Sequence, residues 1–329
     1  MRIAMRTALG LVVGLATVGL VAGCGKEGSS GTSAPQSVSG SGCAPIKGTD
    51  LVVLTDDKSL QTADNIIPAI NAKINNPSLV AALDKVSDAL DTDKLTALNK
   101  AVDIDRKTPK VAAQEFATAQ KLTDGITKGP GGAIKIGAAN FSENQILGSL
   151  YEIVLDAAGY DATVRQIGNR EIYLPQLEKG DISVSPEYAG TLTEFLNGQI
   201  NGSSAKPLAS GDVDKTVAAL KDLGAKKDLA FGKASKAADQ NAFAVTKEFA
   251  DKYGVKTLSD FASKCSGKAT ILGGPAECPQ RPFCKPGLEK TYGIEFGSFA
   301  SLDSAGPQTK AALRGGTITI GLVLSSSPY

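Results

Sequence analysis

Apolar side chains recur at helical spacing in the first third of the chain, after one short apolar run. The run Leu51–Leu54 consists of β-branched and aliphatic residues and predicts a strand. Asn76 can cap a helix that has Pro77 in its first turn, because proline lacks an N–H that the first turn leaves unpaired. Leucine and valine side chains then repeat on one face of this helix. Helices are predicted over residues 77–90, after a cap at Thr92, and from Thr108 to about Leu122.

From Ala133 onward, short apolar runs alternate with amphipathic segments, after a break at residues 128–132. This alternation predicts parallel sheets covered by helices. Ligands on such sheets bind at the carboxyl ends of the strands. Strands are predicted at residues 133–137, 162–167, 182–185, 229–231, 243–246, 270–272 and 318–324, and helices at 143–158, 171–179, 215–223 and 309–314.

The first residues have the polarity pattern of an export signal. Arg2 and Arg6 precede an apolar run, residues 8–21, that is too short to span a bilayer comfortably. Small residues then lead to Cys24, and the Gly/Ser-rich stretch after it predicts a flexible tether. We expect a signal peptide at residues 1–23, lipidation of Cys24 and a tether at residues 24–46. An ordinary signal peptide with an incidental cysteine is the alternative.

Composition narrows the classes of function. The chain has 35 lysine and arginine residues against 34 aspartate and glutamate residues, so it gives no reason to expect nucleic-acid binding. It has no histidine, which removes His-based acid–base catalysis and the commonest metal ligand. About 280 residues follow the tether, enough for two α/β lobes. We expect no enzyme activity, catalytic residue, cofactor or metal site.

Four cysteines remain once Cys24 is set aside, and an even number in an oxidising compartment predicts two disulfides. Cys278 and Cys284 flank a proline-containing loop and are close enough to pair across one turn. Cys43 and Cys265 would then pair with each other, although three connectivities are possible. Zinc binding is the alternative, but the spacing of Cys278 and Cys284 suits it poorly.

Three stretches carry a family resemblance: "IGAANFSENQILG" (Ile136 to Gly148), "GNREIYLPQLEKGDISVSPEYAGTL" (Gly168 to Leu192) and "ILGGPAECPQRPFCKPGLEKTYGIEF" (Ile271 to Phe296). Together they resemble the substrate-binding proteins of glycine betaine/carnitine/choline ABC importers. The resemblance covers nearly everything from about Lys47 to Tyr329. "PEYAGT" after "REIY…LEKGDI" is its most specific part.

The resembling segments stand in a different order from the family's. In the family an "ANFSENQIL"-like segment begins the domain and a "LVVL.DD" segment ends it, whereas here residues 47–126 come first. The order resembles a circular permutation, with the old ends joined through Gly125 to Gly132. Chain ends that are close in space can be relocated to an exposed loop. Relatives join the points matching Tyr329 and Gly48 by a short loop, and a loop of about six residues reaches at most roughly 20 Å, so these two residues are expected within that distance. The alternative is that residues 47–126 form a separate helical domain.

The resemblance implies an α/β, two-lobed periplasmic-binding-protein fold, type II-like and circularly permuted, with a ligand cleft between lobes that close by a hinge. Lobe I is expected at residues 47–233, from 47–126 and 133–233, and lobe II at residues 234–329. The strands near Leu51 and Leu229 are expected to form the hinge.

The resemblance also implies a function. Family members hold a quaternary ammonium solute in a box of aromatic rings, since a methylated cation cannot donate hydrogen bonds. The expected partners are a small-molecule ligand (glycine betaine, choline or carnitine) and the permease and ATPase subunits of an importer. The protein is expected outside the cytoplasm as a monomer held to the membrane by lipid.

Residue by residue, the resemblance assigns the ligand site. Tyr188 and Thr191 match site positions in "PEYAGT", Phe243 falls where many relatives carry a cage tyrosine, and Arg281 is placed to bind a ligand carboxylate. A cage tyrosine becomes Asp64, which could pair with a cation and would favour choline over a zwitterion. The expected ligand-binding residues are Asp64, Asn140, Asn144, Gln145, Tyr173, Tyr188, Thr191, Phe243 and Arg281.

Each assignment has a structural alternative. Tyr173 lies on a helix and could serve packing, Phe243 could belong to the core, and Asp64 could bond its local backbone. At the level of function, the same fold could bind another small polar solute, such as an amino acid, or could sense a ligand instead of delivering it.

Overall fold

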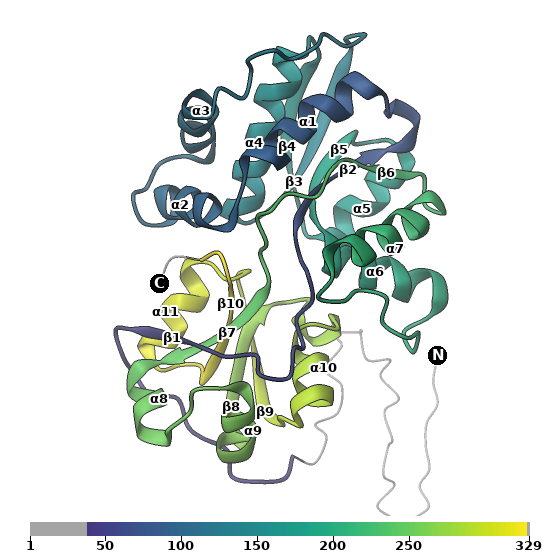
Figure 1. Ribbon diagram of the computed structural model, residues 1–329. Helices are drawn as coiled ribbons and strands as arrows, with labels where there is room; N and C mark the ends of the chain where they lie inside the picture. Colours follow the sequence, from purple (N-terminus) through teal and green to yellow (C-terminus); the bar gives the residue numbers. More distant parts are fainter. Residues whose placement is uncertain (1–37, 328–329) are drawn as a thin grey trace, which may run out of the picture. The chain divides into compact units, whose positions relative to one another are not determined.

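The computed structural model describes residues 38–327, and Figure 1 shows their helices and strands. The predicted signal peptide, the lipidated Cys24 and the chain end at Tyr329 lie outside these residues, so those expectations stay predictions. In the part of the chain that is described, no helix combines the length and apolarity that crossing a membrane requires.

The first lobe is built on a five-stranded sheet with the order β4-β3-β5-β2-β6. Strands β3, β4 and β5 are parallel, whereas β2 runs antiparallel to both β5 and β6. The carboxyl ends of the three parallel strands therefore meet at one edge. The strands are β2 (Ile66–Asn71), β3 (Ala133–Ala139), β4 (Asp161–Gly168), β5 (Val184–Tyr188) and β6 (Leu229–Phe231).

Helices cover both faces of this sheet. Ile66 and Ile70 of β2 pack with helices α1 to α4 on one face, and Ile67 and Ala69 pack with α5 to α7 on the other. Burying such an aliphatic side chain contributes about 1.5–3 kcal/mol. The helices are α1 (Pro77–Ala89), α2 (Thr92–Asp103), α3 (Pro109–Ala119), α4 (Ser142–Ala157), α5 (Arg170–Lys179), α6 (Ala189–Asn201) and α7 (Val213–Ala225).

The second lobe has its own five-stranded sheet, in the order β1-β7-β10-β8-β9. β7 is antiparallel to its neighbours β1 and β10, and the other pairs are parallel. Its elements are β1 (Leu51–Leu54), β7 (Asn241–Thr246), α8 (Lys247–Tyr253), α9 (Leu258–Cys265), β8 (Gly267–Pro275), α10 (Lys285–Gly287), β9 (Phe296–Leu302), α11 (Pro307–Gly315) and β10 (Ile320–Leu324), with a short 3-10 helix at Cys278–Gln280 and a π-helix at Leu288–Tyr292. A further 3-10 helix, Ala72–Ile74, follows β2 in the first lobe.

Local capping explains where several helices begin. The side chain of Asn76 accepts the Leu79 N–H at 3.0 Å, as the sequence predicts for α1. Helix α2 is capped by Asp91, which accepts the Lys94 N–H at 2.9 Å, and not by Thr92. The predicted cap was therefore wrong by one residue.

Two segments connect the lobes: residues 55–65 join β1 to β2, and residues 232–240 join β6 to β7. They lie side by side (Figure 1), since Asn65 and Ala238 form an antiparallel bridge and the Asp239 N–H donates to the Asp64 carbonyl at 3.1 Å. We call them the crossing segments.

This path corrects the predicted lobe boundaries. Leu51–Leu54 pairs with β7 in the second sheet, so the assignment of residues 47–54 to lobe I was wrong. The strand at Leu229 pairs with β2 inside the first sheet, so the strands near Leu51 and Leu229 do not form a hinge together.

The residues before β1 also belong to the second lobe. Ser41 bridges Gly267 at the start of β8, and Cys43 is buried and bonded to Cys265. The expected tether of residues 24–46 therefore ends before Ser41.

Both expected disulfides are present. Cys43 pairs with Cys265 at a sequence separation of 222, and Cys278 pairs with Cys284 at a separation of 6. The second bond closes the loop that carries Arg281.

Residues 47–126 are not a separate domain. β2 lies between β5 and β6, and α1 to α3 pack into the core that contains Ile136. Residues 125–132 are largely exposed and have no helix or strand, as expected for a surface connection. The sequence did not predict β2, β9, α6, α8, α9 or α10.

The two disulfides should differ in their effect on stability. Closing a loop restricts the unfolded chain more when the loop is longer, which gives about 5 kcal/mol for Cys43–Cys265 and about 2 kcal/mol for Cys278–Cys284. We expect Cys43→Ser/Cys265→Ser to lower the free energy of unfolding by roughly twice as much as Cys278→Ser/Cys284→Ser. Urea titrations of both variants measure this, and a larger loss in the second variant would contradict it.

Candidate ligand-binding site

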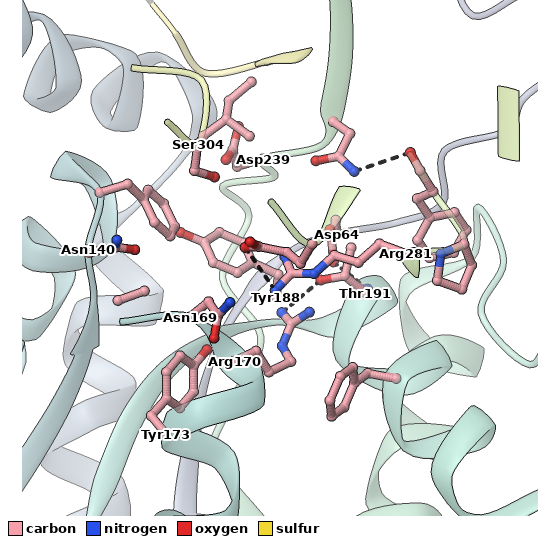
Figure 2. A pocket seen from close by; sticks show the side chains of 18 residues that line it. Asp64, Asn140, Asn169, Arg170, Tyr173, Tyr188, Thr191, Asp239, Arg281 and Ser304 are labelled. Carbon is pink, nitrogen blue, oxygen red and sulfur yellow. Dashed lines mark hydrogen bonds and ion pairs between the residues drawn. The ribbon is translucent and has the colours of Figure 1, made fainter. Parts of the chain in front are cut away.

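A cavity lies where the carboxyl ends of β3, β4 and β5 face the second lobe (Figure 2). Its lining combines aromatic rings, carboxyl groups, arginines and side-chain amides, and it includes residues of both crossing segments. The lining residues are Asp64, Ala139, Asn140, Phe141, Asn169, Arg170, Tyr173, Tyr188, Thr191, Phe195, Asp239, Asn241, Glu277, Arg281, Pro282, Phe283, Ser304 and Leu324.

Helix N-termini meet at this cavity. Phe141, Asn169 and Tyr188 precede α4, α5 and α6, and none of them makes a side-chain cap. All three line the cavity. A helix N-terminus carries unpaired N–H groups and a partial positive charge. Acidic side chains of the protein meet this charge: Glu143 and Glu171 lie in the first turns of α4 and α5, and Asp64 accepts the Thr191 N–H of α6.

Tyr188 and Phe141 form an aromatic wall. Their ring centroids are 6.2 Å apart and the rings are tilted by 31°. The Tyr188 hydroxyl donates to Glu143 Oε1 at 2.8 Å, which fixes the orientation of the ring. Burial, together with the negative charge of Glu143, raises the pKa of Tyr188 well above its usual value, so the hydroxyl stays protonated.

A buried ion pair forms the floor of the site. Arg170 Nη2 lies 2.6 Å from Glu187 Oε2 and donates to Thr191 Oγ1 at 2.9 Å. The Tyr173 hydroxyl donates to the same carboxylate at 2.7 Å. Burial lowers the pKa of Arg170, but the attraction of Glu187 outweighs it and raises the pKa overall. Glu187 is thus a structural residue of the floor.

Asp64 faces the cavity from the first crossing segment. Its Oδ1 accepts the Thr191 N–H at 2.8 Å in the first turn of α6. Burial raises the pKa of Asp64 to about 7, against the opposing effect of that hydrogen bond. Near neutral pH this group therefore changes between a neutral acid and an anion.

Arg281 joins the two lobes at the edge of the cavity. Its Nε and Nη2 donate to the two carboxylate oxygens of Glu171, on α5, at 3.2 and 2.9 Å. Its Nη2 also lies 3.4 Å from Glu277 Oε1. The carboxylate that Arg281 binds in this structure is that of Glu171, and not one free for a ligand.

The structure brings six of the predicted residues together at the cavity and leaves three away from it. Asn144 is fully buried and holds the backbone, accepting from Ala139 N at 2.7 Å and donating to the Pro186 carbonyl at 3.1 Å. Gln145 lines a neighbouring second cavity. Phe243 is 1 % exposed in the core of the second lobe, so its assignment to an aromatic cage was wrong.

Several lining residues were not predicted. Phe141 and Arg170 stand inside the quoted motifs, and Phe283 lies two residues after Arg281, so the signal was present in the sequence. Phe195 lies on α6, a helix that the sequence did not predict. Asp239 had no motif around it and comes to the cavity only through the crossing segment.

Among residues 38–327, no group of three or more His, Cys, Asp or Glu side chains is arranged to hold a metal ion. The cavity offers aromatic faces, carboxyl groups and helix N-termini, which suit an organic ion.

The chain is similar to known proteins that bind glycine betaine or related solutes. A curated relative, the glycine-betaine-binding protein of Pseudomonas aeruginosa, is 31 % identical over 90 residues, which are 27 % of this chain. The match spans only 29 % of that relative's length. A solved structure described as a glycine betaine/carnitine/choline ABC transporter is 27 % identical, with a TM-score of 0.38, over 58 % of this chain and 68 % of that one.

The family described as the substrate binding domain of the ABC-type glycine betaine transport system matches residues 44–119 and 132–328. The unmatched residues between these ranges include the exposed connection before β3. Because the matched ranges make up well over half of the chain, it belongs to this family of substrate-binding domains.

Proposed function

We propose that this protein captures a quaternary ammonium solute (glycine betaine, choline or carnitine) outside the cytoplasm and delivers it to the permease of an ABC importer. The observation that carries the proposal is a cavity that combines aromatic faces with buried carboxyl groups. A methylated cation cannot donate hydrogen bonds, so π-faces and nearby negative charge recognise it. Tyr188, Phe141 and Phe283 supply the rings, and Asp64 supplies the charge.

The balance of charge in the cavity favours a cation over a zwitterion. Arg170 is neutralised by Glu187 and Arg281 by Glu171. The carboxyl groups of Asp64 and Asp239 have no such cationic partner among the ion pairs of the described residues. In addition, the buried Oδ1 of Asn169 accepts no hydrogen bond within those residues, and the hydroxyl of choline could donate to it. We infer that choline is the preferred ligand.

The membrane anchor and the circular permutation belong to the same proposal. Lipidation of Cys24 would keep the protein beside its permease. For the permutation, support comes from the packing of α1 to α3 on the first sheet and from the exposed connection at residues 125–132, which overlaps the gap at residues 120–131 between the two ranges of the family match.

Calorimetric titration of the ligands tests the function. We expect choline, glycine betaine or carnitine to bind, and proline and other amino acids not to bind. Tyr188→Ala should weaken cation binding by roughly 1–2 kcal/mol, because a desolvated cation–π contact is lost. Tyr188→Phe keeps the ring face and serves as the matched control. If only an amino acid binds, the proposal is wrong and the protein binds another small polar solute on the same fold.

Asp64→Asn should affect binding in a pH-dependent manner. The wild-type carboxyl is mostly neutral below its pKa of about 7 and charged above it. Compared with the wild type, the variant should therefore bind choline weaker by about tenfold or more at pH 8.5, and with the same affinity at pH 5.5. Asparagine can still accept the Thr191 N–H, so the backbone contact is kept. Equal losses at both pH values would contradict a charge-based role.

Asp64→Asn should weaken choline binding at high pH but should make the folded protein more stable there than the wild type. Because the folded-state pKa is raised above its unfolded value of 3.8, the wild type loses stability as pH rises from about 4 to about 7, by on the order of 4 kcal/mol. Asp64→Asn should lack this loss. Thermal unfolding across that range measures it.

Arg281→Ala and Glu171→Ala should each weaken the binding of choline and of glycine betaine by the same few-fold factor. A partly exposed ion pair contributes about 0.2–1 kcal/mol, and here it stabilises lobe closure. The double variant should be no weaker than either single one. Lys285→Ala removes an ion pair within the second lobe and is the control. A selective loss of glycine betaine in Arg281→Ala would show that Arg281 binds the ligand carboxylate instead.

A further inference from the structure

Beside the ligand cavity, one hydroxyl lies between two buried carboxyl groups. Ser326 Oγ is 2.6 Å from Glu143 Oε2 and 2.6 Å from Asp239 Oδ1. Glu143 lies in the first turn of α4 in the first lobe, Asp239 in the second crossing segment, and Ser326 two residues after β10 of the second lobe. Glu143 and Asp239 are 2 % and 3 % exposed. The cluster therefore connects both lobes and a crossing segment out of contact with water.

The hydrogens in this cluster can be counted. A serine hydroxyl has one hydrogen and can donate it to only one carboxyl oxygen. If both carboxyl groups were ionised, the other 2.6 Å contact would join two oxygens with no hydrogen between them, which is repulsive. One additional proton must therefore lie on the carboxyl pair. With it, the hydroxyl donates to one carboxyl oxygen and accepts from the other.

The remaining donors support one negative charge on the pair, and not two. Glu143 accepts from Asn99 Nδ2 at 2.6 Å and from the Tyr188 hydroxyl at 2.8 Å, and Asp239 accepts from Ser326 N at 3.1 Å. All of these donors are neutral. Burial raises the pKa of both carboxyl groups, and the charge of Glu143 raises that of Asp239 further.

Among residues 38–327, the cations beside the pair are already matched with other carboxylates. The ionisable groups that line the two adjoining cavities, besides the pair itself, are Asp64, Tyr173, Tyr188, Glu277, Arg170 and Arg281, with Asp103 on α2 and Asp303 before α11. Arg170 is paired with Glu187, Arg281 with Glu171, and Lys310 of α11 lies 3.9 Å from Asp103.

We propose that Glu143 and Asp239 hold one proton between them, and that this proton fastens the two lobes in their closed arrangement through Ser326. Loss of the proton places two carboxylates against one hydroxyl. Moving Ser326, and with it the second lobe, away from Glu143 relieves the repulsion. The cleft then opens, while Tyr188 keeps its hydrogen bond to Glu143 within the first lobe. The proton count stands by itself, whereas its effect on ligand affinity rests on the proposed function.

The proton is tested first without ligand. Infrared spectra of the purified protein at pH 8, where Asp64 is mostly ionised, should contain the carbonyl band of a protonated carboxylic acid. Asp239→Asn should remove the band, because Glu143 alone keeps three neutral donors and ionises. Asp103→Asn, which changes an acid of the neighbouring cavity outside the pair, should keep it. Absence of the band in the wild type would overturn the shared proton.

Lobe closure is tested by the dependence on pH between 8 and 10. The radius of gyration from small-angle X-ray scattering should increase with pH in the wild type and in Asp103→Asn. The Kd for choline should rise by up to tenfold per pH unit, as expected for the loss of one proton. Both slopes should be flat in Asp239→Asn, whatever its absolute affinity.

The outcomes separate the role of the shared proton in lobe closure from the proposed function. Equal slopes in Asp239→Asn and the wild type would overturn the link between the proton and closure. If no quaternary ammonium compound binds, the proposed function fails. The scattering and infrared results still decide whether the shared proton holds the lobes together. If Asp239→Asn does not fold, the wild-type band and the wild-type scattering slope decide it, since a radius that does not change up to pH 10 contradicts the proposal.

Discussion

The antiparallel pairing of β2 with β5 is the contact on which the rest of the structure depends. Its register sets Ile66 opposite Tyr188. The residues just before β2 are therefore carried past the first turn of α6, where Asp64 meets the Thr191 N–H. The same pairing brings α1 to α3 over the first sheet, although they precede β3 in sequence. One strand thus completes the core of the first lobe and positions an acidic group in the cavity.

The sequence predicted the elements whose signals are local. Asn76 and Pro77 marked the start of α1 because a cap and a first-turn proline act within a few residues. β2 was missed because it is buried on both faces, so it has no alternation, and because Pro68 argues against a central strand. The structure accommodates Pro68 by placing it opposite Pro186. Neither proline can donate, so the pair occupies a position of the ladder that needs no N–H.

The site was predicted where a motif and the cavity coincide, and missed where they do not. Tyr188 and Thr191 follow directly from "PEYAGT", since the motif runs from the carboxyl end of β5 into the first turn of α6. Phe243 could not be distinguished from a cage residue, because a strand buried on both faces does not show which side its ring takes. Arg281 illustrates a further limit: its partner Glu171 is 110 residues away, on the other lobe. Only the tertiary fold brings the two charges together.

The bond between Cys43 and Cys265 has a mechanical consequence. A pull on the chain at Val38 meets the hydrogen bonds of Gly40 and Ser41 to β8 and then the covalent bond to the end of α9, before it reaches the hydrogen bonds of β1 at the edge of the sheet. Load from that direction therefore cannot peel β1 from β7. The second lobe takes the force as a rigid body. The first lobe, attached through the two crossing segments, stays free to rotate relative to it.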